Sequence, residues 1–484
     1  MWRNLKTRYE GMSVQVRTSI WFLICSFLQK GISVITTPVF TRLLSTSEYG
    51  QYNAFDSWLR IITIFVSLNL YSGVYTQGLV KFSEDRRRFS SSLQGLTLTL
   101  AVVWTTVYLL FYRYWNSLLS LTTVQMLAML AMIWSTSAFN LWAGEQRVEY
   151  KYQKLVIATL IVSIIKPVVG IVFVKLATDK VTARILGLAL VELIGYVGFF
   201  IVQTVRGKLF YSARYWKYAL MFNIPLIPHY LSQTVLNSAD RIMIKNMIGK
   251  SEAGIYGLAY SISQIMTLFN IALSQTLSPW IYQKIKDKKE KDIAPIAYIT
   301  MVIIAVANLF LILLAPEAVA IFAPEPYQDA IWVIPPVAMS VFFMYSYDLF
   351  AKFTLYYEKT KFVMVASVLA AALNVILNYI FIGKFGYFAA GYTTLVCYIA
   401  YSFGHYLFMR KICKDFCRGN YPYDTRIIIF ITIPFLILGF IFMATYKYPG
   451  IRYGIVGVSL IIAFIMRKRI FDIITKIVSL KKQT

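Results

Sequence analysis

Three basic side chains, Lys30, Arg60 and Arg241, lie within stretches of the sequence that are otherwise apolar. A charged side chain at the centre of a bilayer costs about 2.5–3.5 kcal/mol on insertion scales, so such residues normally face water or a partner. These cations therefore predict a polar cavity within the membrane. Local salt bridges are the alternative explanation.

Two acidic residues lie beside these cations in the sequence. Asp56 is four residues before Arg60, a spacing at which two side chains on one helix can pair. Asp240 precedes Arg241 directly, and adjacent residues point about 100° apart around a helix. Separate partners for Asp240 and Arg241 are therefore favoured over mutual neutralisation.

Three further titratable residues have more than one explanation. Lys166 and Glu192 either pair with each other or line the interior of the helix bundle. For His229, a hydrogen-bonded buried histidine is favoured over a proton switch. Pro225 and Pro228 predict a kink in the same helix as His229.

Polar residues extend these charges along one face of four predicted helices. In the first helix they are spaced i, i+4, i+7 and i+11, which is the period of an α-helical face. The four stripes are Ser26, Lys30, Ser33 and Thr37; Asn53, Asp56, Ser57, Arg60, Thr63 and Ser67; Tyr230, Gln233, Thr234, Asn237, Arg241 and Lys245; and Tyr256, Tyr260, Ser263, Gln264, Thr267, Asn270 and Ser274. Hydrogen bonding between helices explains the uncharged members equally well, but it does not require three cations.

Membrane-spanning helices must carry these side chains. Of 484 residues, 58% are hydrophobic and 14% are charged, against about 25% charged in a soluble protein. Apolar blocks of roughly 20 residues recur along the chain and are long enough to span a bilayer. We predict fourteen helices, near residues 17–41, 50–74, 89–112, 117–141, 155–176, 183–205, 217–246, 252–279, 293–315, 328–350, 362–383, 386–409, 425–446 and 450–467. The class is an all-α polytopic membrane protein without an inserted soluble domain, and its first span is retained because no signal-peptide cleavage site follows it.

The distribution of Lys and Arg predicts the orientation. Of the 48 basic residues, 34 fall on one alternating set of segments that includes the N-terminus, and 10 fall on the opposite set. The positive-inside rule then places both termini in the cytoplasm. The net charge of +26 is explained by this topology and by attraction to lipid headgroups, so we expect no nucleic-acid partner. In the tail, an apolar face from Ile470 to Leu480 predicts a helix on the inner membrane surface, with a disordered basic tail as the alternative.

An internal repeat links the two halves of the chain. The segment TRLLSTSEYGQYNAFDSWLRIIT (41–63) aligns with KNMIGKSEAGIYGLAYSISQIMT (245–267) at an offset of 204 residues, and Gln29 aligns with Gln233. The offset covers six predicted spans, so both copies have the same orientation. We predict two parallel six-helix lobes, residues 1–210 and 211–412, followed by two helices and the tail in 413–484. Parallel repeats with a substrate path between them are a transporter architecture.

Motif searches exclude several classes of enzyme. The sequence has no phosphate-binding G-x-x-x-x-G-K-[ST] loop, no H-E-x-x-H and no G-x-S-x-G. Its two histidines are 176 residues apart, which argues against a histidine-based metal site or catalytic triad. Cys25, Cys397, Cys413 and Cys417 are predicted to be plain thiols, the last two on a cytoplasmic loop. We therefore expect no catalytic residues, no metal and no cofactor.

Three segments resemble a known family of transporters. LQKGISVITTPVFTRLLSTSEYGQYNAF (28–55), IPLIPHYLSQTVLNSADRIMIKNMIGKSEAGIYGLAYSIS (224–263) and LSPWIYQKI (277–285) are similar to the polysaccharide-transport flippases. These O-antigen and capsule repeat-unit flippases of bacteria belong to the multidrug/oligosaccharidyl-lipid/polysaccharide exporter superfamily. The resemblance implies two six-helix lobes around a central cavity, alternating access, and a substrate of a few sugars on undecaprenyl pyrophosphate. It also implies a multi-pass location in the cytoplasmic (inner) membrane, where the polymerase and chain-length regulator of the pathway are possible partners.

The resemblance gives the polar stripes a role. Cations in a water-filled cleft can bind the pyrophosphate, and neutral polar side chains can bind sugar hydroxyls. The expected substrate residues are Lys30, Arg60, Arg241, Lys245, Gln29, Gln233, Asn237, Tyr260 and Gln264. Expected to bind a coupling cation or to tune the basic residues are Asp56, Asp240, Glu192, Lys166 and His229.

Two other functions and one departure from the family remain open. A cation-coupled multidrug exporter of the same fold is the first alternative, and a membrane polysaccharide polymerase or ligase is the second. The longest external loop has about a dozen residues, which is short for a catalytic loop. Relatives often have twelve spans, so helices 13 and 14 either form a lipid-facing groove or pack on the outside.

Overall fold

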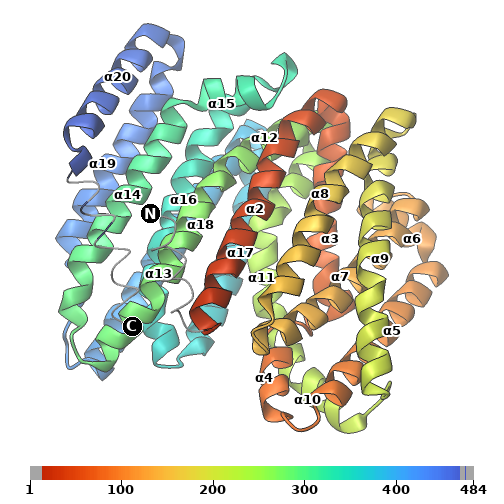
Figure 1. The fold of residues 1–484 in the computed structure, drawn as a ribbon. Helices are drawn as coiled ribbons and strands as arrows, with labels where there is room; N and C mark the ends of the chain where they lie inside the picture. Colours follow the sequence, from red (N-terminus) through yellow and green to blue (C-terminus); the bar gives the residue numbers. More distant parts are fainter. Residues whose placement is uncertain (1–13, 469–471, 473–474, 476–484) are drawn as a thin grey trace, which may run out of the picture. The chain divides into compact units, whose positions relative to one another are not determined.

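A computed structural model describes residues 14–468, 472 and 475 of the chain. Every regular element in this part of the chain is helical (Figure 1), which confirms the all-α class. The apolar tail face predicted from Ile470 to Leu480 lies outside the described residues. The chain divides into two compact units, unit 1 (residues 1–234) and unit 2 (residues 235–484). This division falls inside helix α11, and the lobe boundaries predicted at residues 210 and 412 remain predictions.

Unit 1 contains helices α2 to α10 and the start of α11. Their bounds are α2 (Val14–Leu43), α3 (Thr46–Ser67), α4 (Val74–Lys81), α5 (Arg86–Leu110), α6 (Tyr112–Leu119), α7 (Thr123–Val148), α8 (Tyr152–Leu176), α9 (Lys180–Gly207), α10 (Ala213–Asn223), the 3₁₀ turn η1 (Ile224–Leu226) and α11 (Ile227–Met247). Helix α9 packs against α5, α7 and α8, and α2 packs against α8. The core is largely aliphatic and aromatic, as in Phe89, Leu93 and Ile133.

The repeated turn starts a helix in both units. In the first copy, the Ser45 side chain accepts a hydrogen bond from the backbone N–H of Glu48, and the Glu48 carboxylate accepts one from the Ser45 N–H at 2.7 Å. This capping box satisfies two backbone donors at the start of α3. In the second copy, Glu252 occupies the same third position of α12, after Gly249.

Unit 2 is arranged around one central helix. The bounds of its elements after α11 are α12 (Lys250–Ser263), η2 (Gln264–Met266), α13 (Thr267–Lys286), η3 (Glu290–Asp292), α14 (Ile293–Leu313), α15 (Ala315–Phe322), η4 (Glu325–Tyr327), α16 (Ala330–Tyr356), α17 (Thr360–Phe385), α18 (Phe388–Phe416), α19 (Thr425–Ala444), η5 (Thr445–Lys447) and α20 (Pro449–Ile465). Helix α16 is almost wholly buried and contacts α12, α13, α14, α17, α18 and α19. Helix α19 packs on α14 and α16 but leaves most of its surface exposed, so it lies on the outside of unit 2.

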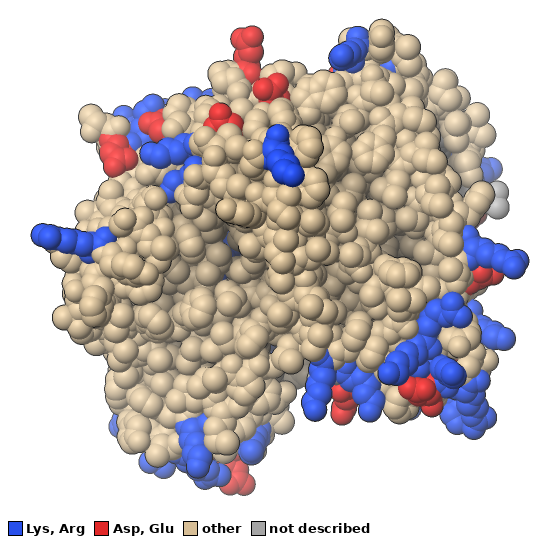
Figure 2. All heavy atoms as spheres, turned by 180° about the vertical axis from the view of Figure 1, so that it is seen from behind, with Lys and Arg blue, Asp and Glu red and all other residues tan. Residues whose placement is uncertain are grey.

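The helices have the composition of membrane spans. Nine helices in the described part of the chain are long and apolar enough to cross a membrane. The long helices α2, α3, α11 and α18 fall outside that set, and the first three carry Lys30, Arg60 and Arg241. The expected count of fourteen spans therefore remains a prediction. On the face drawn in Figure 2, charged side chains gather along the upper, lower and side margins, and the broad surface between them is almost free of charge.

A candidate substrate and ion site in the membrane helices

Helix α11 carries most of the site residues predicted in the second half of the chain. The 3₁₀ turn η1, which contains Pro225, separates α10 from α11, so the expected break at these prolines is present. Proline has no backbone N–H for the helical ladder, which explains the break. His229 lies in the first turn of α11, and its buried Nδ1 has no hydrogen-bond partner among the described residues. The expectation of a hydrogen-bonded histidine is therefore wrong for this nitrogen.

Asp240 lies at the centre of a buried polar network. Its side chain is 0% exposed and accepts hydrogen bonds from Tyr256 Oη at 2.6 Å, Asn378 Nδ2 at 2.6 Å and Thr394 Oγ1 at 3.0 Å. Asn378 also donates to Asn374 Oδ1 at 3.2 Å. The network joins α11, α12, α17 and α18. Its hydrogen-bond donors are all neutral, so no ion pair within the network balances a carboxylate charge.

Arg241 faces a different set of partners from Asp240, as the helix geometry predicted. Its guanidinium lies over the ring of Tyr260, 4.2 Å from the centroid, and Nη2 donates to the Asn237 carbonyl at 2.5 Å. The side chain is 8% exposed, and its Nε has no hydrogen-bond partner in the described part of the chain. Asn237 Oδ1 accepts from Tyr260 Oη at 3.2 Å and from Tyr398 Oη at 3.0 Å. Arg241 thus lies among aromatic hydroxyl and amide groups, without a carboxylate within 4 Å among the described residues.

The other predicted residues of this part of the chain are more dispersed. Gln233 is half-buried on α11, and Lys245 is 8% exposed near the C-terminal end of the same helix. Gln264 is half-buried in η2, where the regular α-helix of α12 is interrupted before α13.

In unit 1, the predicted cations lie at more exposed positions. Arg60 Nε contacts Asp56 Oδ2 at 2.9 Å, which confirms the pairing expected from their spacing, and the Arg60 side chain is 60% exposed. Lys30 is exposed on α2, and the charge of Arg60 acts on it. Gln29 lies next to Lys30 in sequence, but its amide donates to Ser163 Oγ on α8 at 3.2 Å. Lys30, Asp56 and Arg60 therefore form one group, while Gln29 contributes to helix packing.

Lys166 and Glu192 pair with each other, which is one of the two explanations left open by the sequence. Lys166 Nζ lies 2.5 Å from Glu192 Oε1, and Glu192 Oε2 accepts from Thr136 Oγ1 at 3.0 Å. The pair joins α8 to α9, and Thr136 extends it to α7. The Glu192 side chain is 8% exposed, so this pair is largely enclosed within unit 1.

The structure brings together several residues that the sequence patterns did not single out. Asn374 and Asn378 are four residues apart in the apolar helix α17, and this spacing is the signal in the sequence that indicates them. A second group lies on α13 and α16, where Lys352 Nζ contacts Asp348 Oδ1 at 2.9 Å and Ser274 Oγ at 2.9 Å. Lys352 lies beyond the helix predicted at residues 328–350, but α16 continues to Tyr356 and buries its side chain.

The four cysteines lie in the described part of the chain, where all are free and buried. Cys413 lies within α18, so its predicted place on a loop is wrong, whereas Cys417 directly follows the helix. A hydrogen bond with the Cys413 thiol lowers the pKa of Cys417, while burial acts in the opposite direction. Within the described residues, no group of three or more His, Cys, Asp or Glu side chains is arranged to hold a metal ion.

The architecture defines the structural class. The chain is similar to the inward closed structure of the lipid II flippase MurJ, with a TM-score of 0.72 at 14% identity, covering 93% of this chain and 100% of that one. It is also similar to an inward-facing multidrug resistance MATE family transporter of the MOP superfamily, with a TM-score of 0.61 at 13% identity, covering 81% and 96%. At these identities the likeness shows the fold alone. The protein is a polytopic membrane protein with the fold of these transporters.

The sequence comparisons define the family. The model of the family described as "Polysaccharide biosynthesis protein" matches residues 16–285, more than half of the chain, and the chain belongs to this family. The MatE family model matches residues 225–380. Two relatives come from Haemophilus influenzae: an "Uncharacterized membrane protein", 22% identical over 367 residues (74% of this chain, 88% of the relative), and "Lsg locus putative protein 1", 20% identical over 373 residues (74% and 89%). The family resemblance identified from the sequence motifs is confirmed.

Proposed function

We propose that this protein is a flippase that carries undecaprenyl-pyrophosphate-linked oligosaccharide repeat units across the bacterial cytoplasmic membrane by alternating access. The translocated units would serve O-antigen or other surface polysaccharide assembly, together with a polymerase and a chain-length regulator. Membership of the polysaccharide biosynthesis protein family supports this proposal, as does the fold shared with a lipid II flippase. Neither identifies the substrate, which has to be argued from the side chains.

The environment of Arg241 is the observation that carries the proposal. A guanidinium that is 8% exposed within an apolar helix is costly, and among the described residues Arg241 forms no ion pair with a carboxylate, although the charge of the adjacent Asp240 acts on it. A pyrophosphate would provide the missing negative charge through charge-assisted hydrogen bonds. Asn237, Tyr260 and Tyr398 lie around Arg241 and offer amide and hydroxyl groups suited to sugar hydroxyls.

Lys30 and Arg60 would supply further positive charge from unit 1. The Arg60–Asp56 pair is exposed, and pairs of this kind contribute only about 0–1 kcal/mol, so Arg60 can exchange its carboxylate partner for a phosphate at little cost. We infer that Lys30 and Arg60 contact the headgroup during part of the transport cycle.

Asp240 suits the coupling role that its position in the sequence suggested. A fully buried carboxylate with neutral partners is costly when ionised, and a bound proton or monovalent cation would compensate its charge. The same feature favours the alternative function, a cation-coupled multidrug exporter. The two functions differ in what accumulates when the protein is disabled: lipid-linked repeat units in one case and drug in the other.

The proposal predicts that Arg241→Ala abolishes polymer at the cell surface while the protein remains in the membrane. Lys30→Ala should act in the same direction. Surface polymer is measured by immunoblot in cells lacking the chromosomal copy, together with lipid-linked repeat units extracted from the inner membrane. Arg113→Ala is the control because Arg113 is exposed on the short helix α6. Wild-type polymer in both the Arg241 and Lys30 variants would refute the cavity assignment, and drug hypersensitivity with normal polymer would favour the exporter.

The proposed orientation makes a separate prediction about labelling. Single cysteines introduced at Lys250 and Lys288, in a variant without the four native cysteines, should react from opposite sides of the membrane. Both native positions are exposed at helix ends. A membrane-impermeant maleimide should label position 250 in intact cells, and position 288 only after permeabilisation. The reverse pattern would invert the topology.

A further inference from the structure

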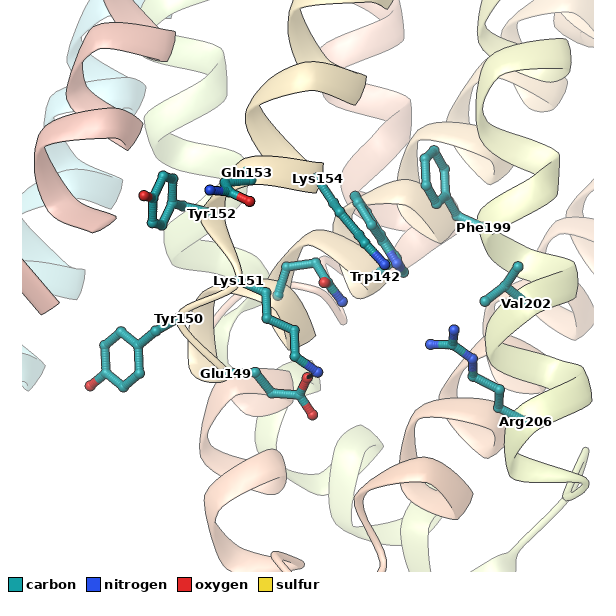
Figure 3. Close-up of a pocket in the computed structure, with 11 residues that line it drawn as sticks. Trp142, Glu149, Tyr150, Lys151, Tyr152, Gln153, Lys154, Phe199, Val202 and Arg206 are labelled. Carbon is teal, nitrogen blue, oxygen red and sulfur yellow. Dashed lines mark hydrogen bonds and ion pairs between the residues drawn. The ribbon is translucent and has the colours of Figure 1, made fainter. Parts of the chain in front are cut away.

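A cavity of about 610 Å³ opens in unit 1 where α7 turns into α8 beside the C-terminal end of α9 (Figure 3). Three basic side chains, Lys151, Lys154 and Arg206, line it together with Trp142, Phe199 and Val202. Its volume is in the range of natural small-molecule sites. None of the proposed substrate residues lines this cavity, so it is a separate feature of the molecule.

The local backbone builds the cavity from three helix ends. Tyr150 has a left-handed φ of 55°, which turns the chain sharply between the end of α7 and the start of α8. Helix α8 then begins at Tyr152 and directs its first turn at the cavity. On the other side, α9 approaches α5 closely, because a Cβ at Gly207 would lie 2.2 Å from the Arg87 carbonyl oxygen. This close packing fixes the position of the neighbouring Arg206.

The electrostatics of the cavity favour an anion. The cavity has one acidic lining residue, Glu149, which is already paired with Lys151 at 2.6 Å. Among the described residues, Lys154 and Arg206 make no hydrogen bond and no ion pair. Helix α8 begins at Tyr152 beside these cations, and the residue before it, Lys151, makes no side-chain cap. Cations together with a helix N-terminus form a typical phosphate-binding arrangement.

The cavity is also amphipathic. The rings of Trp142 and Phe199 lie 4.1 Å apart and form an apolar wall, as Figure 3 shows beside Lys154. Exposed aliphatic side chains, Val202 on α9 and Ile157 and Ile161 on α8, lead away from the charged end. The distribution of Lys and Arg predicts that the charged end lies at the cytoplasmic surface, at the level of the lipid headgroups. A ligand with an anionic head and apolar chains fits both parts.

We infer that this cavity binds an anionic phospholipid of the cytoplasmic leaflet, with its phosphate between Lys154, Arg206 and the N-terminus of α8. The acyl chains then lie along the exposed aliphatic residues of α8 and α9. A lipid bound in this way joins the start of α8 to the end of α9, which stabilises the cytoplasmic end of unit 1. A phospholipid is preferred over the transported substrate because none of the proposed substrate residues lines this cavity.

The inference is tested by native mass spectrometry of the purified full-length protein, titrated with phosphatidylglycerol or phosphatidylcholine. Wild-type protein should retain phosphatidylglycerol at least about 10-fold more tightly than phosphatidylcholine, as expected for charge-assisted contacts. The double variant Lys154→Gln/Arg206→Gln should lose most of this preference. The matched control is Arg87→Gln/Arg88→Gln, which removes two exposed cations from the start of α5 and should leave the preference intact. Equal retention in wild type and in the Lys154/Arg206 variant would overturn the inference.

Two further arms identify the source of the phosphate. Brominated phosphatidylglycerol in liposomes should quench tryptophan fluorescence in wild type more than in Trp142→Phe, because Trp142 lines the cavity. Bromine on phosphatidylcholine should show no such difference. If inorganic phosphate displaces phosphatidylglycerol at equal concentration, the site recognises a free anion. If undecaprenyl phosphate is retained and phosphatidylglycerol is not, the cavity belongs to the substrate carrier. Either result would overturn the assignment to a phospholipid.

Discussion

The two copies of the repeated helix–turn–helix share their backbone plan but not their chemistry. Glu48 and Glu252 occupy the same third position of α3 and α12. The aligned tyrosines differ: the Tyr52 ring stacks on the Arg184 guanidinium at 3.5 Å, whereas the Tyr256 hydroxyl donates to Asp240 at 2.6 Å. The residue aligned with Asp240 in the first copy is Thr36. The turn is therefore conserved as architecture, and the polar groups around it have diverged.

The difference separates two ways of keeping charge in a membrane helix. In unit 1, Arg60 and Lys166 each contact a carboxylate, so their charges are neutralised within the protein. On α11, Asp240 and Arg241 have neutral partners instead. A paired charge is satisfied at rest, whereas a charge with only neutral partners can gain stabilisation from a ligand of opposite sign. This comparison favours a structural role for the enclosed Lys166–Glu192 pair and ligand binding for the α11 charges, while the exposed Arg60–Asp56 pair can open at little cost.

The largest effect is expected at Asp240. Asp240→Ala leaves three buried hydrogen-bond donors without their acceptor, at about 1–3 kcal/mol for each group that stays unsatisfied. We therefore expect a large fall in the unfolding midpoint of the purified protein, together with loss of surface polymer. Asp240→Asn keeps most of the network and should retain folding while losing transport.

The first copy provides the control for Asp240. The exposed Thr36 hydroxyl donates to the Ser33 carbonyl of its own helix at 3.1 Å, so Thr36→Ala should change the unfolding midpoint little. Unaltered transport by Asp240→Asn would show that ionisation of Asp240 is not needed in the transport cycle. Equal destabilisation by the Thr36 and Asp240 substitutions would show that the two copies are equivalent after all.

A smaller effect is expected from the aligned tyrosines. Tyr256→Phe removes a buried hydrogen bond to a carboxyl group, which is worth about 1.5–3 kcal/mol. Tyr52→Phe retains an aromatic face for Arg184. The free energy of unfolding should therefore change by no more than about 0.5 kcal/mol. Thermal unfolding of the two purified variants measures the contrast. A larger loss of unfolding free energy for Tyr52→Phe than for Tyr256→Phe would show that the hydroxyl of Tyr52, and not that of Tyr256, makes the stronger stabilising contact.

Sequence reasoning predicted local features of the fold and only part of the site. Helical periodicity, the prolines at 225 and 228 and the repeat are all encoded within short segments, and the structure bears out the break and the Asp56–Arg60 pair. The partners of Asp240 come from residues more than 130 positions later, at Asn378 and Thr394. A single sequence does not indicate which helices meet, so these residues were missed.

Two further residues show where the sequence says little about contacts. Gln29 aligns with Gln233 and was expected among the substrate residues; its amide donates to Ser163 on α8, and its substrate role stays a prediction. The helix predicted at residues 328–350 ends before Lys352. In the structure, α16 continues to Tyr356, and an ion pair with Asp348 holds Lys352 within the helix. Ends of elements are therefore the points at which composition is the weakest guide.

The smallest difference in stability is expected at the residues that precede α3 and α12, Ser45 and Gly249. Ser45→Ala removes the side chain that caps α3 and should cost about 0.5–2 kcal/mol. Gly249 takes the corresponding place in the second copy, yet its N–H already bonds to the Ile244 carbonyl at 3.1 Å and it has no side-chain cap to lose. Its φ of 169° is extended backbone that alanine can adopt, and the nearest atom to an added Cβ is the carboxylate oxygen of Glu252, at the end of a flexible side chain. Gly249→Ala should therefore leave the unfolding midpoint within about 0.5 kcal/mol of wild type. Equal losses of stability in Ser45→Ala and Gly249→Ala would show that the second turn requires glycine at position 249. The two copies would then differ in the backbone of the turn as well as in its side chains.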